Sequence, residues 1–490
     1  MEYGSLIATV ALIVWIPLSL AVFSFFKPHR AVAILLVGGA ILLPERETLT
    51  VPLLPDIDKK TIACAWALIP AMIWAWRRLK KPQLGKMPWV LLAGLMVVDV
   101  MRAALNGDAI NYGAAFVPHI PLHTAITFML QDLLVLWAPF YLGATMFKER
   151  EQLKDLLKIF VIAGVCYIPF ILIELRLSPQ LHRWVYGFMQ HSFAQVMREG
   201  GYRPMVFMEH GLAVALFMAT CTLIATGLAR AKERVGRFPA WLVALVLLAV
   251  VTLLKSFGAL LFLVALAPVV WFTSPRMQLR IAALLAAAII LYPMMRWLDW
   301  IPTKGLVDLA GMYSADRAGS LSFRFENEDL VLHKAFERPL FGWGGFGRIF
   351  VLDPWTGGEL TTFDGDWLIT YAAAGVCGFV AKYGLLVWPV WLAWRRLRKV
   401  RHKGDQMLIG ALGVATVMVV LDLLPNGMFT YFPALLAGTL LGATRELSRP
   451  DQGLMPAQGA SAPPRAYAPQ RPRQPSNVYA RRSNNGAPPA

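Results

Sequence analysis

The chain has 490 residues, of which 57% are hydrophobic and only 16% are charged. Soluble domains carry about 25% charged residues, and a soluble chain this apolar would lack the polar side chains that cover a water-exposed surface. The composition therefore excludes an ordinary soluble protein and indicates one that exposes apolar side chains to lipid.

The net charge is +17, from 47 Lys and Arg against 30 Asp and Glu. In a soluble protein this excess would point to nucleic acid. Here the basic residues cluster in short segments between apolar runs, as in membrane proteins, so we do not expect nucleic acid as a partner. The four cysteines lie within apolar stretches and lack the spacing of metal ligands, which predicts no disulfide framework.

Apolar runs long enough to form membrane helices recur along most of the chain. About 20 apolar residues cross the hydrocarbon core of a bilayer. We expect an all-α, polytopic membrane protein with about 12–13 transmembrane helices, because a few of the runs are short or interrupted by Pro or Gly. The predicted spans are 5–26, 31–44, 60–76, 87–104, 124–146, 156–175, 204–228, 239–254, 257–274, 279–297, 364–394, 406–424 and 429–445.

The segments between the spans form two alternating sets. Short, basic segments lie at 27–30, 77–86, 148–158, 230–237, 276–280 and 395–403. Longer segments with acids, glycines and aromatic residues lie at 45–59, 105–123, 176–203 and 298–363. Basic loops stay in the cytoplasm, so we expect the N-terminus and the second set outside and the C-terminus inside.

The two ends of the chain differ in kind. The first span lacks a basic segment before it and a small-residue cleavage site after it, so we do not expect a cleaved signal. Residues 1–445 form the polytopic domain, with 298–363 as its large outer loop. Residues 446–490 are rich in Pro, Ala, Gln and Asn. Because such a segment cannot bury enough apolar surface to offset its ordering entropy, we expect a disordered cytoplasmic tail.

The first polar region on the expected outer side is 198–210. Arg203 is expected near the membrane edge. If the seventh span is helical from residue 204, Glu209 and His210 lie about 10 Å deeper, at about 1.5 Å per residue. Ionisable groups at that depth are costly and normally face a polar cavity. The sequence therefore predicts a polar cavity open to the outer face, with an ion pair between Glu209 and an arginine as the alternative.

The second polar region is the large outer loop. Arg324 and Glu328 stand four residues apart on a segment with helical propensity, which allows a simple ion pair. This interpretation leaves the roles of Arg317, Glu326 and His333 unassigned. Downstream, the glycines of 342–347 permit positive φ, and such a stretch either cradles phosphate or forms a plain turn. No Walker lysine accompanies it, so we exclude ATP binding.

Two aspartates open the next span. One carboxylate at a helix N-terminus caps the helix and matches its dipole, which accounts for either Asp364 or Asp366. If the two carboxylates are close, the pKa of one rises and that group becomes a usable base. A metal site needs more oxygen ligands than the sequence places there, so we expect none.

Several short sequence stretches follow one another in a characteristic order between residues 120 and 445. They are Tyr141–Lys148, Arg203–Ala213, Arg324 with Ala335–Gly344, and Asp364–Trp367 with Gly375–Gly378. As an ordered set they resemble the O-antigen polymerase and O-antigen ligase superfamily.

The resemblance implies a glycosyltransferase of the bacterial inner membrane that acts on the periplasmic face without a metal or cofactor. Its donor would be a glycan on undecaprenyl pyrophosphate, and its partners would include a chain-length regulator or other polysaccharide-assembly proteins. The acceptor is another lipid-linked repeat unit in a polymerase and the lipid A–core in a ligase of lipopolysaccharide. Ligases commonly carry a His-Asn pair where this chain has 364–367, so a polymerase of O-antigen or exopolysaccharide is favoured.

The residue types suit this chemistry by themselves. Guanidinium groups bind pyrophosphate bidentately and stay charged, and a carboxylate or imidazole can take the proton from an acceptor hydroxyl. We assign substrate binding to Arg203, Arg317, Arg324 and Asp366. The candidate catalytic bases are Glu209, His210 and Asp364, in no fixed order.

Two other classes of function stay open. A transporter or flippase for a polar or lipid-linked solute would concentrate charge near the midplane of the membrane. Charged residues inside predicted spans are Asp99, Asp132, Lys382 and Asp422. These also suit buried ion pairs or positions nearer an interface. We see no inverted repeat of the kind that many transporters carry. The third class is a structural or scaffolding protein.

Overall fold

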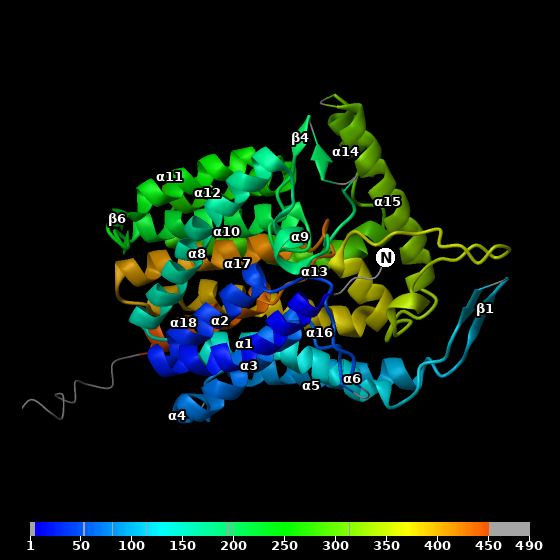
Figure 1. The fold of residues 1–490 in the computed structure, drawn as a ribbon, viewed down its shortest axis with the longest axis horizontal. Helices are drawn as coiled ribbons and strands as arrows, with labels where there is room; N and C mark the ends of the chain where they lie inside the picture. The colour runs from blue at the N-terminus through cyan, green and yellow to red at the C-terminus, as the bar shows by residue number, and fades with distance from the viewer. Residues whose placement is uncertain are drawn as a thin grey trace, which may run out of the picture. The chain divides into compact units, whose positions relative to one another are not determined.

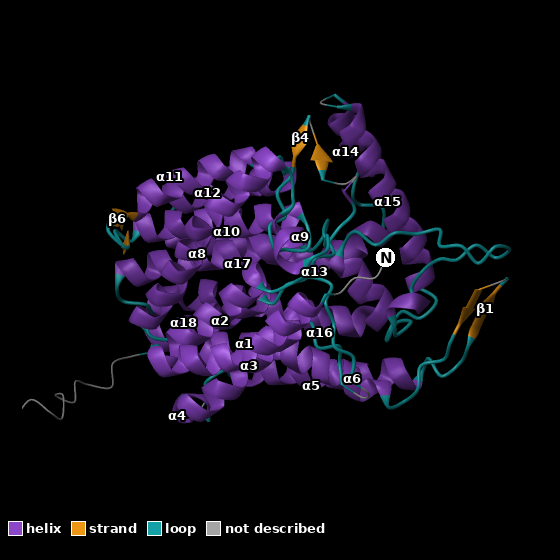
Figure 2. Ribbon diagram, in the orientation of Figure 1, coloured by secondary structure: helices purple, strands orange, loops and turns teal. Residues whose placement is uncertain are grey.

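The computed structural model describes residues 5–449 apart from 52–53, 81, 114, 194–195, 199 and 313. Most of the tail predicted to be disordered, from residue 450 onward, therefore lies outside the described residues. Helices form nearly all of the regular structure (Figure 1 and Figure 2). The all-α prediction is confirmed.

Each predicted span corresponds to helix in the structure. The helices are α1 (Leu6–Phe25), α2 (Pro28–Leu42), α3 (Lys59–Trp74), α5 (Lys86–Ala104), α6 (Thr124–Gln131) continued by the π-helix η1 (Asp132–Trp137) and α7 (Ala138–Met146), α8 (Arg150–Leu177), α10 (Gly211–Arg230), α11 (Ala240–Leu253), α12 (Phe257–Phe272), α13 (Pro275–Trp297), α16 (Asp366–Arg396), α17 (Lys403–Asp422) and α18 (Phe432–Leu447). Proline or a polar residue stands at or near most of their ends, as expected of helix boundaries.

Short elements lie between these helices. The short helices are α4 (Trp76–Leu79), α9 (Leu181–Tyr186) and α14 (Thr303–Gly311), with the 3₁₀ turns η3 (Phe346–Arg348) and η4 (Leu397–Lys399). Helix α15 (Ala315–Ala335) also lies between the predicted spans but is longer. The strands form three antiparallel pairs: β1 (Ile110–Tyr112) with β2 (Ala115–Val117), β3 (Met197–Arg198) with β4 (Gly201–Tyr202), and β5 (Arg234–Val235) with β6 (Phe238–Pro239). Their registers pair Ile110 with Val117, Met197 with Tyr202 and Arg234 with Pro239.

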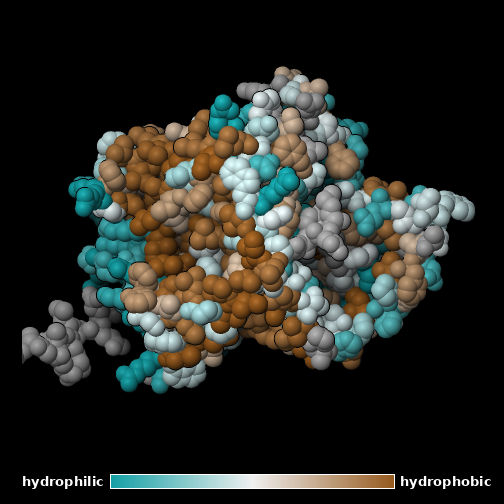
Figure 3. Space-filling model, viewed as in Figure 1, coloured by the Kyte–Doolittle hydropathy of each residue, from teal (hydrophilic) through white to brown (hydrophobic). Residues whose placement is uncertain are grey.

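Eight of the described helical segments are long and apolar enough to cross a membrane. Three further apolar helices, α2, α11 and α12, are shorter, with 15, 14 and 16 residues. At about 1.5 Å per residue these reach only about 21–24 Å, so length alone does not give the full expected number of spans. Figure 3 shows apolar side chains over α11, α12, α1 and α3, and hydrophilic side chains at α4 and β6. The chain is thus a multi-pass membrane protein.

Close packing in the interior depends on small residues. α18 packs along α7 and α16, while α17 packs against α10 and α13. A Cβ at Gly438 would overlap the backbone of Phe140, and one at Gly442 would overlap that of Ala144. Glycines four residues apart let the α7 and α18 backbones approach closely, which favours helix association in lipid.

Helix α16 is broken near its middle. Gly375 has φ +65°, a conformation that glycine adopts without strain. The Val376 N–H therefore donates to the carbonyl of Pro339 (2.8 Å), and in return the Gly344 N–H donates to the carbonyl of Ala373 (2.8 Å). The glycine-rich stretch 342–347 donates hydrogen bonds to carbonyls of α16 that the break leaves without helical partners. Irregular backbone inside a membrane protein requires such replacement bonds. The N–H groups at 343 and 344 bond to carbonyls of α16, so these two are not available to cradle a phosphate.

The seventh span differs from the prediction. Residues 203–210 are not helical, and α10 begins only at Gly211, with His210 as its N-cap. The prediction that residues 204–210 are helical is therefore wrong, and the depth of about 10 Å derived from it for Glu209 and His210 loses its basis. Pro204 favours an extended residue before it, and Val206 adopts φ +51°, which no helix contains.

Candidate functional site

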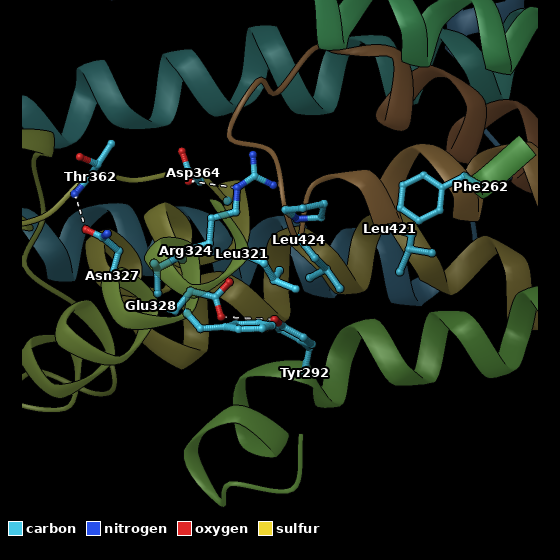
Figure 4. A pocket seen from close by; sticks show the side chains of 14 residues that line it. Phe262, Tyr292, Leu321, Arg324, Asn327, Glu328, Thr362, Asp364, Leu421 and Leu424 are labelled. Carbon is cyan, nitrogen blue, oxygen red and sulfur yellow. Dashed lines mark hydrogen bonds and ion pairs between the residues drawn. The ribbon is translucent and has the colours of Figure 1, made fainter. Parts of the chain in front are cut away.

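A cavity of about 240 Å³ lies where α12, α13, α15 and α17 approach the start of α16 (Figure 4). Much of its wall is apolar, with Phe262 from α12, Leu321 from α15, and Leu421 and Leu424 at the end of α17. Arg324 and Asp364 are among its few charged side chains. A mostly apolar cavity with a few convergent polar groups is typical of a ligand site.

Arg324 and Asp364 form an ion pair inside this cavity. The Arg324 Nε lies 3.3 Å from the Asp364 carboxylate, and the two side chains are 32% and 37% exposed. Figure 4 shows the guanidinium and the carboxylate turned toward each other. A guanidinium has five N–H donors, so this contact leaves others for an anionic ligand.

Glu328 has a different partner from the one that the four-residue spacing allowed. Arg296, at the end of α13, donates to Glu328 (2.8 Å) and to Asp329 (2.6 Å), and the Tyr292 hydroxyl donates to Glu328 (3.3 Å). Glu328 therefore pairs with the buried Arg296, and Arg324 pairs with Asp364 instead. Burial raises the pKa of Glu328, although the hydrogen bond from Arg296 opposes this.

The other two predicted arginines flank the turn between α11 and α12. The buried Arg203 donates to the carbonyl of Lys255 (3.0 Å). Arg317 lies over the ring of Phe257, with its guanidinium carbon 4.5 Å from the ring centre. Arg317 and Arg324 share one face of α15 and are separated by about 10 Å of helical rise. Arg203 and Arg317 thus contact the same turn, and Arg324 lies about two helical turns farther along α15.

Buried side chains from several helices hold residues 203–210 in place. Glu174 on α8 accepts from the N–H groups of Met205 (2.8 Å) and Val206 (2.7 Å), and also from that of Leu181 (3.0 Å). Other contacts to the segment are Gln190 to the carbonyls of Val206 and Met208, Lys59 to the carbonyl of Phe207, and the Phe207 N–H to Tyr167. The segment is fixed without helical hydrogen bonds, because these side chains replace them.

Glu209 and His210 stand at the end of this segment. Glu209 lies 4.0 Å from Lys60, so its partner is a lysine rather than the arginine of the alternative prediction. His210 accepts the Leu212 N–H through Nδ1 (3.1 Å) and caps α10. Its ring lies 4.9 Å from that of His191. Neither residue is among those that line the cavity around Arg324.

Asp366 belongs to a separate cluster of polar side chains. It is 5% exposed, accepts from Lys382 (2.9 Å) and from the Tyr383 hydroxyl (2.8 Å), and begins the first turn of α16. Asp364 thus pairs with Arg324 and Asp366 with Lys382. Each carboxylate has its own basic partner, so the structure does not require the two carboxylates to influence each other. Asp366 does not line the cavity.

Three of the four charged residues noted inside predicted spans have a close polar partner, which for Asp422 is a neutral amide. Asp99 lies 2.9 Å from Arg102, Lys382 is the partner of Asp366, and Asp422 accepts from Asn426 (2.9 Å). Sequence analysis singled out these charges but missed their partners. It also missed Tyr292 and Arg296, since only the tertiary structure brings the end of α13 within reach of Glu328 on α15.

Among the described residues, no group of three or more His, Cys, Asp and Glu is placed to hold a metal ion. The four cysteines are free thiols, with Cys166 exposed. No protein-family model matches the chain, and a search of curated proteins finds no match. Function must therefore be argued from the site itself.

Proposed function

We propose that the protein is a metal-independent glycosyltransferase that lengthens a surface polysaccharide, O-antigen or exopolysaccharide, from a donor glycan on undecaprenyl pyrophosphate. The observation that carries the proposal is the Arg324–Asp364 ion pair inside a mostly apolar cavity at the ends of membrane helices. The resemblance of the sequence to the O-antigen polymerase and ligase superfamily supports the same reaction.

The cavity offers each part of such a donor a complementary surface. The pyrophosphate is doubly charged and planar guanidinium groups bind it bidentately, a role for Arg324. Phe262 and Leu421 suit the first isoprene units of the lipid by apolar contact. Arg317 and Arg203, farther along the same edge, add positive charge that draws the anionic group toward the cavity.

Asp364 is the best placed of the candidate bases, because it lines the cavity and already contacts Arg324. In the proposed step Asp364 takes the proton from an acceptor hydroxyl, whose oxygen bonds to the anomeric carbon of the donor sugar. The bond from that carbon to the pyrophosphate oxygen breaks, and undecaprenyl pyrophosphate leaves with the electron pair. Arg324 stabilises the charge that develops on the leaving oxygen.

We place the reaction on the periplasmic face of the bacterial inner membrane, with the N-terminus periplasmic and the C-terminus cytoplasmic. The positive-inside rule supports this orientation. So does the arrangement in Figure 1, in which the basic segments at α4 and β6 lie at the opposite end of the helices from α15. Other polysaccharide-assembly proteins, such as a chain-length regulator, would act on the same face.

The test is a reconstitution of the purified full-length protein in liposomes with lipid-linked repeat units. We expect longer lipid-linked chains in a gel of the products, and none with Arg324→Ala. Arg398→Ala, an exposed residue of η4, is the matched control and should lengthen chains normally. If wild-type protein yields no longer chains from any acceptor offered, the transferase proposal fails.

A flippase is the second candidate, and buried charge pairs inside spans favour it. Asp99 with Arg102 and Asp366 with Lys382 place charge between the helices, as solute pathways do. The same liposomes separate the two functions. Movement of lipid-linked units across the bilayer without lengthening would support the flippase.

A further inference from the structure

Helix α14 follows the end of a membrane-spanning helix directly. The spanning helix α13 ends at Trp297, and α14 begins at Thr303 after a short turn. No residue of α14 is buried. A helix of nine residues so close to the end of a span lies near the boundary between lipid and water.

The exposed face of α14 is apolar. Leu306, Leu309 and the adjoining Met312 recur every three residues and are 39%, 62% and 84% exposed. Side chains at this spacing lie along one stripe of a helix. Gly311 faces Ala318 of α15, where a Cβ would lie 3.7 Å away. The apolar stripe thus points away from α15, and nothing among the described residues covers it.

The polar side chains of α14 form a separate edge. Lys304 and Asp308 are four residues apart and both exposed. At about 100° per residue they lie on the opposite side of the helix from Leu306. An apolar stripe bordered by a charged edge is the pattern of a helix that lies in a bilayer surface.

Two exposed tryptophans lie at the last residue of α13 and in the turn before α14. Trp297 is 46% exposed and Trp300 is 62% exposed. Tryptophan is enriched where membrane helices meet the headgroup region, because its ring is apolar and its N–H remains hydrated. The ring of Trp297 packs against Phe336 at the end of α15, whereas Leu298 (45% exposed) and Trp300 continue the exposed apolar side chains along the chain from the end of α13 to the stripe of α14.

From this continuity we infer that α14 lies in the surface of the phospholipid bilayer, with Leu306, Leu309 and Met312 inserted among the acyl chains. Lys304 and Asp308 then face water and headgroups. The occupant of the stripe is lipid, rather than a second copy of the chain or another protein. The inference does not depend on the reaction that the protein catalyses.

Photo-crosslinking of the full-length chain in liposomes tests this inference. p-Benzoylphenylalanine replaces Leu309 in one variant and Met312 in a second, and the liposomes contain phosphatidylethanolamine and phosphatidylglycerol. After illumination we expect intact mass spectra of both variants to show a gain of one phospholipid. Because both positions are exposed, neither substitution should disturb folding.

Two matched positions calibrate the yield. Leu261 on α12 is 51% exposed on the lipid-facing surface and should give the phospholipid adduct as a positive control. Lys304, on the charged edge of α14, should give none above background. If positions 309 and 312 give no lipid adduct while 261 does, or if they crosslink to a second chain, the inference is overturned.

Discussion

The guanidinium of Arg324 and the carboxylate of Asp364 lie 3.3 Å apart, although one belongs to α15 and the other to the loop before α16. Both side chains line a cavity to which α12, α13 and α17 also contribute. The proposed reaction depends on this pair, because it places a permanent cation and a proton acceptor beside one another.

Replacing Arg324 by lysine tests the role of its planar guanidinium group. A lysine keeps the charge but cannot bind pyrophosphate bidentately. We expect Arg324→Lys to lower the rate of chain lengthening by about tenfold to a hundredfold, which corresponds to the loss of a charged hydrogen bond. The measurement is the initial rate in liposomes, at equal protein recovery. A rate equal to wild type would remove Arg324 from donor binding.

Glu174 should stabilise the non-helical segment 203–210. Glu174→Ala leaves three backbone N–H groups without their acceptor, and we expect a loss of about 3 kcal/mol or more in the free energy of unfolding. Thermal unfolding in detergent measures the effect. Glu151→Ala on the same helix is the control, because that side chain is 79% exposed and its removal should change little.

The break in α16 should require glycine at position 375. Gly375→Ala forces a Cβ into the backbone of Leu340 at φ +65°, and we expect a destabilisation of about 1–3 kcal/mol. Gly94→Ala on α5 is the matched control, since a Cβ there meets nothing within 4 Å. It should be neutral or slightly stabilising, because alanine favours helix. Equal melting temperatures for the two variants would contradict the prediction.

Acid should loosen the segment that leads into the hairpin β1–β2 from Arg338 and Arg348. Slight burial favours the protonated form of Asp108, but the hydrogen bond from Arg338 and the charges of Arg338 and Arg348 hold its pKa below the usual range. A lowered pKa stabilises the contact above the ordinary carboxylate pKa and loses this stabilisation as pH falls through the folded value.

Hydrogen exchange measures this pH dependence. Exchange in residues 105–118, corrected for the intrinsic rate, should rise between pH 7 and pH 3 in the wild type. In Asp108→Asn it should already be high at pH 7 and change little. A wild type that exchanges equally at both pH values would show that the carboxylate does not hold the hairpin.

The orientation of the chain can be tested with alkaline phosphatase, which is active only outside the cytoplasm. A fusion near residue 330 on α15 should be active, and one near residue 154, in the basic segment at the start of α8, should be inactive. An expressed but inactive fusion at 330 would reverse the proposed topology and move the cavity to the cytoplasmic face.

Much of the fold could be predicted because helices in lipid depend on local composition. A run of about 20 apolar residues must form a helix to satisfy its own backbone, wherever it packs. The spans α1, α5 and α8 were predicted within a few residues or one to two turns for this reason. The start of α10 was missed, since Glu174 is remote in sequence from the backbone that it satisfies.

Within the candidate site, the sequence by itself determined which residues carry charge near the ends of membrane helices, because ionisable groups there stand out against an apolar chain. It could not determine their partners. Only the tertiary structure decided that Arg324 meets Asp364 while Glu328 meets Arg296. The physical reason is that an ion pair forms over a few ångströms, and packing between helices far apart in sequence sets those distances.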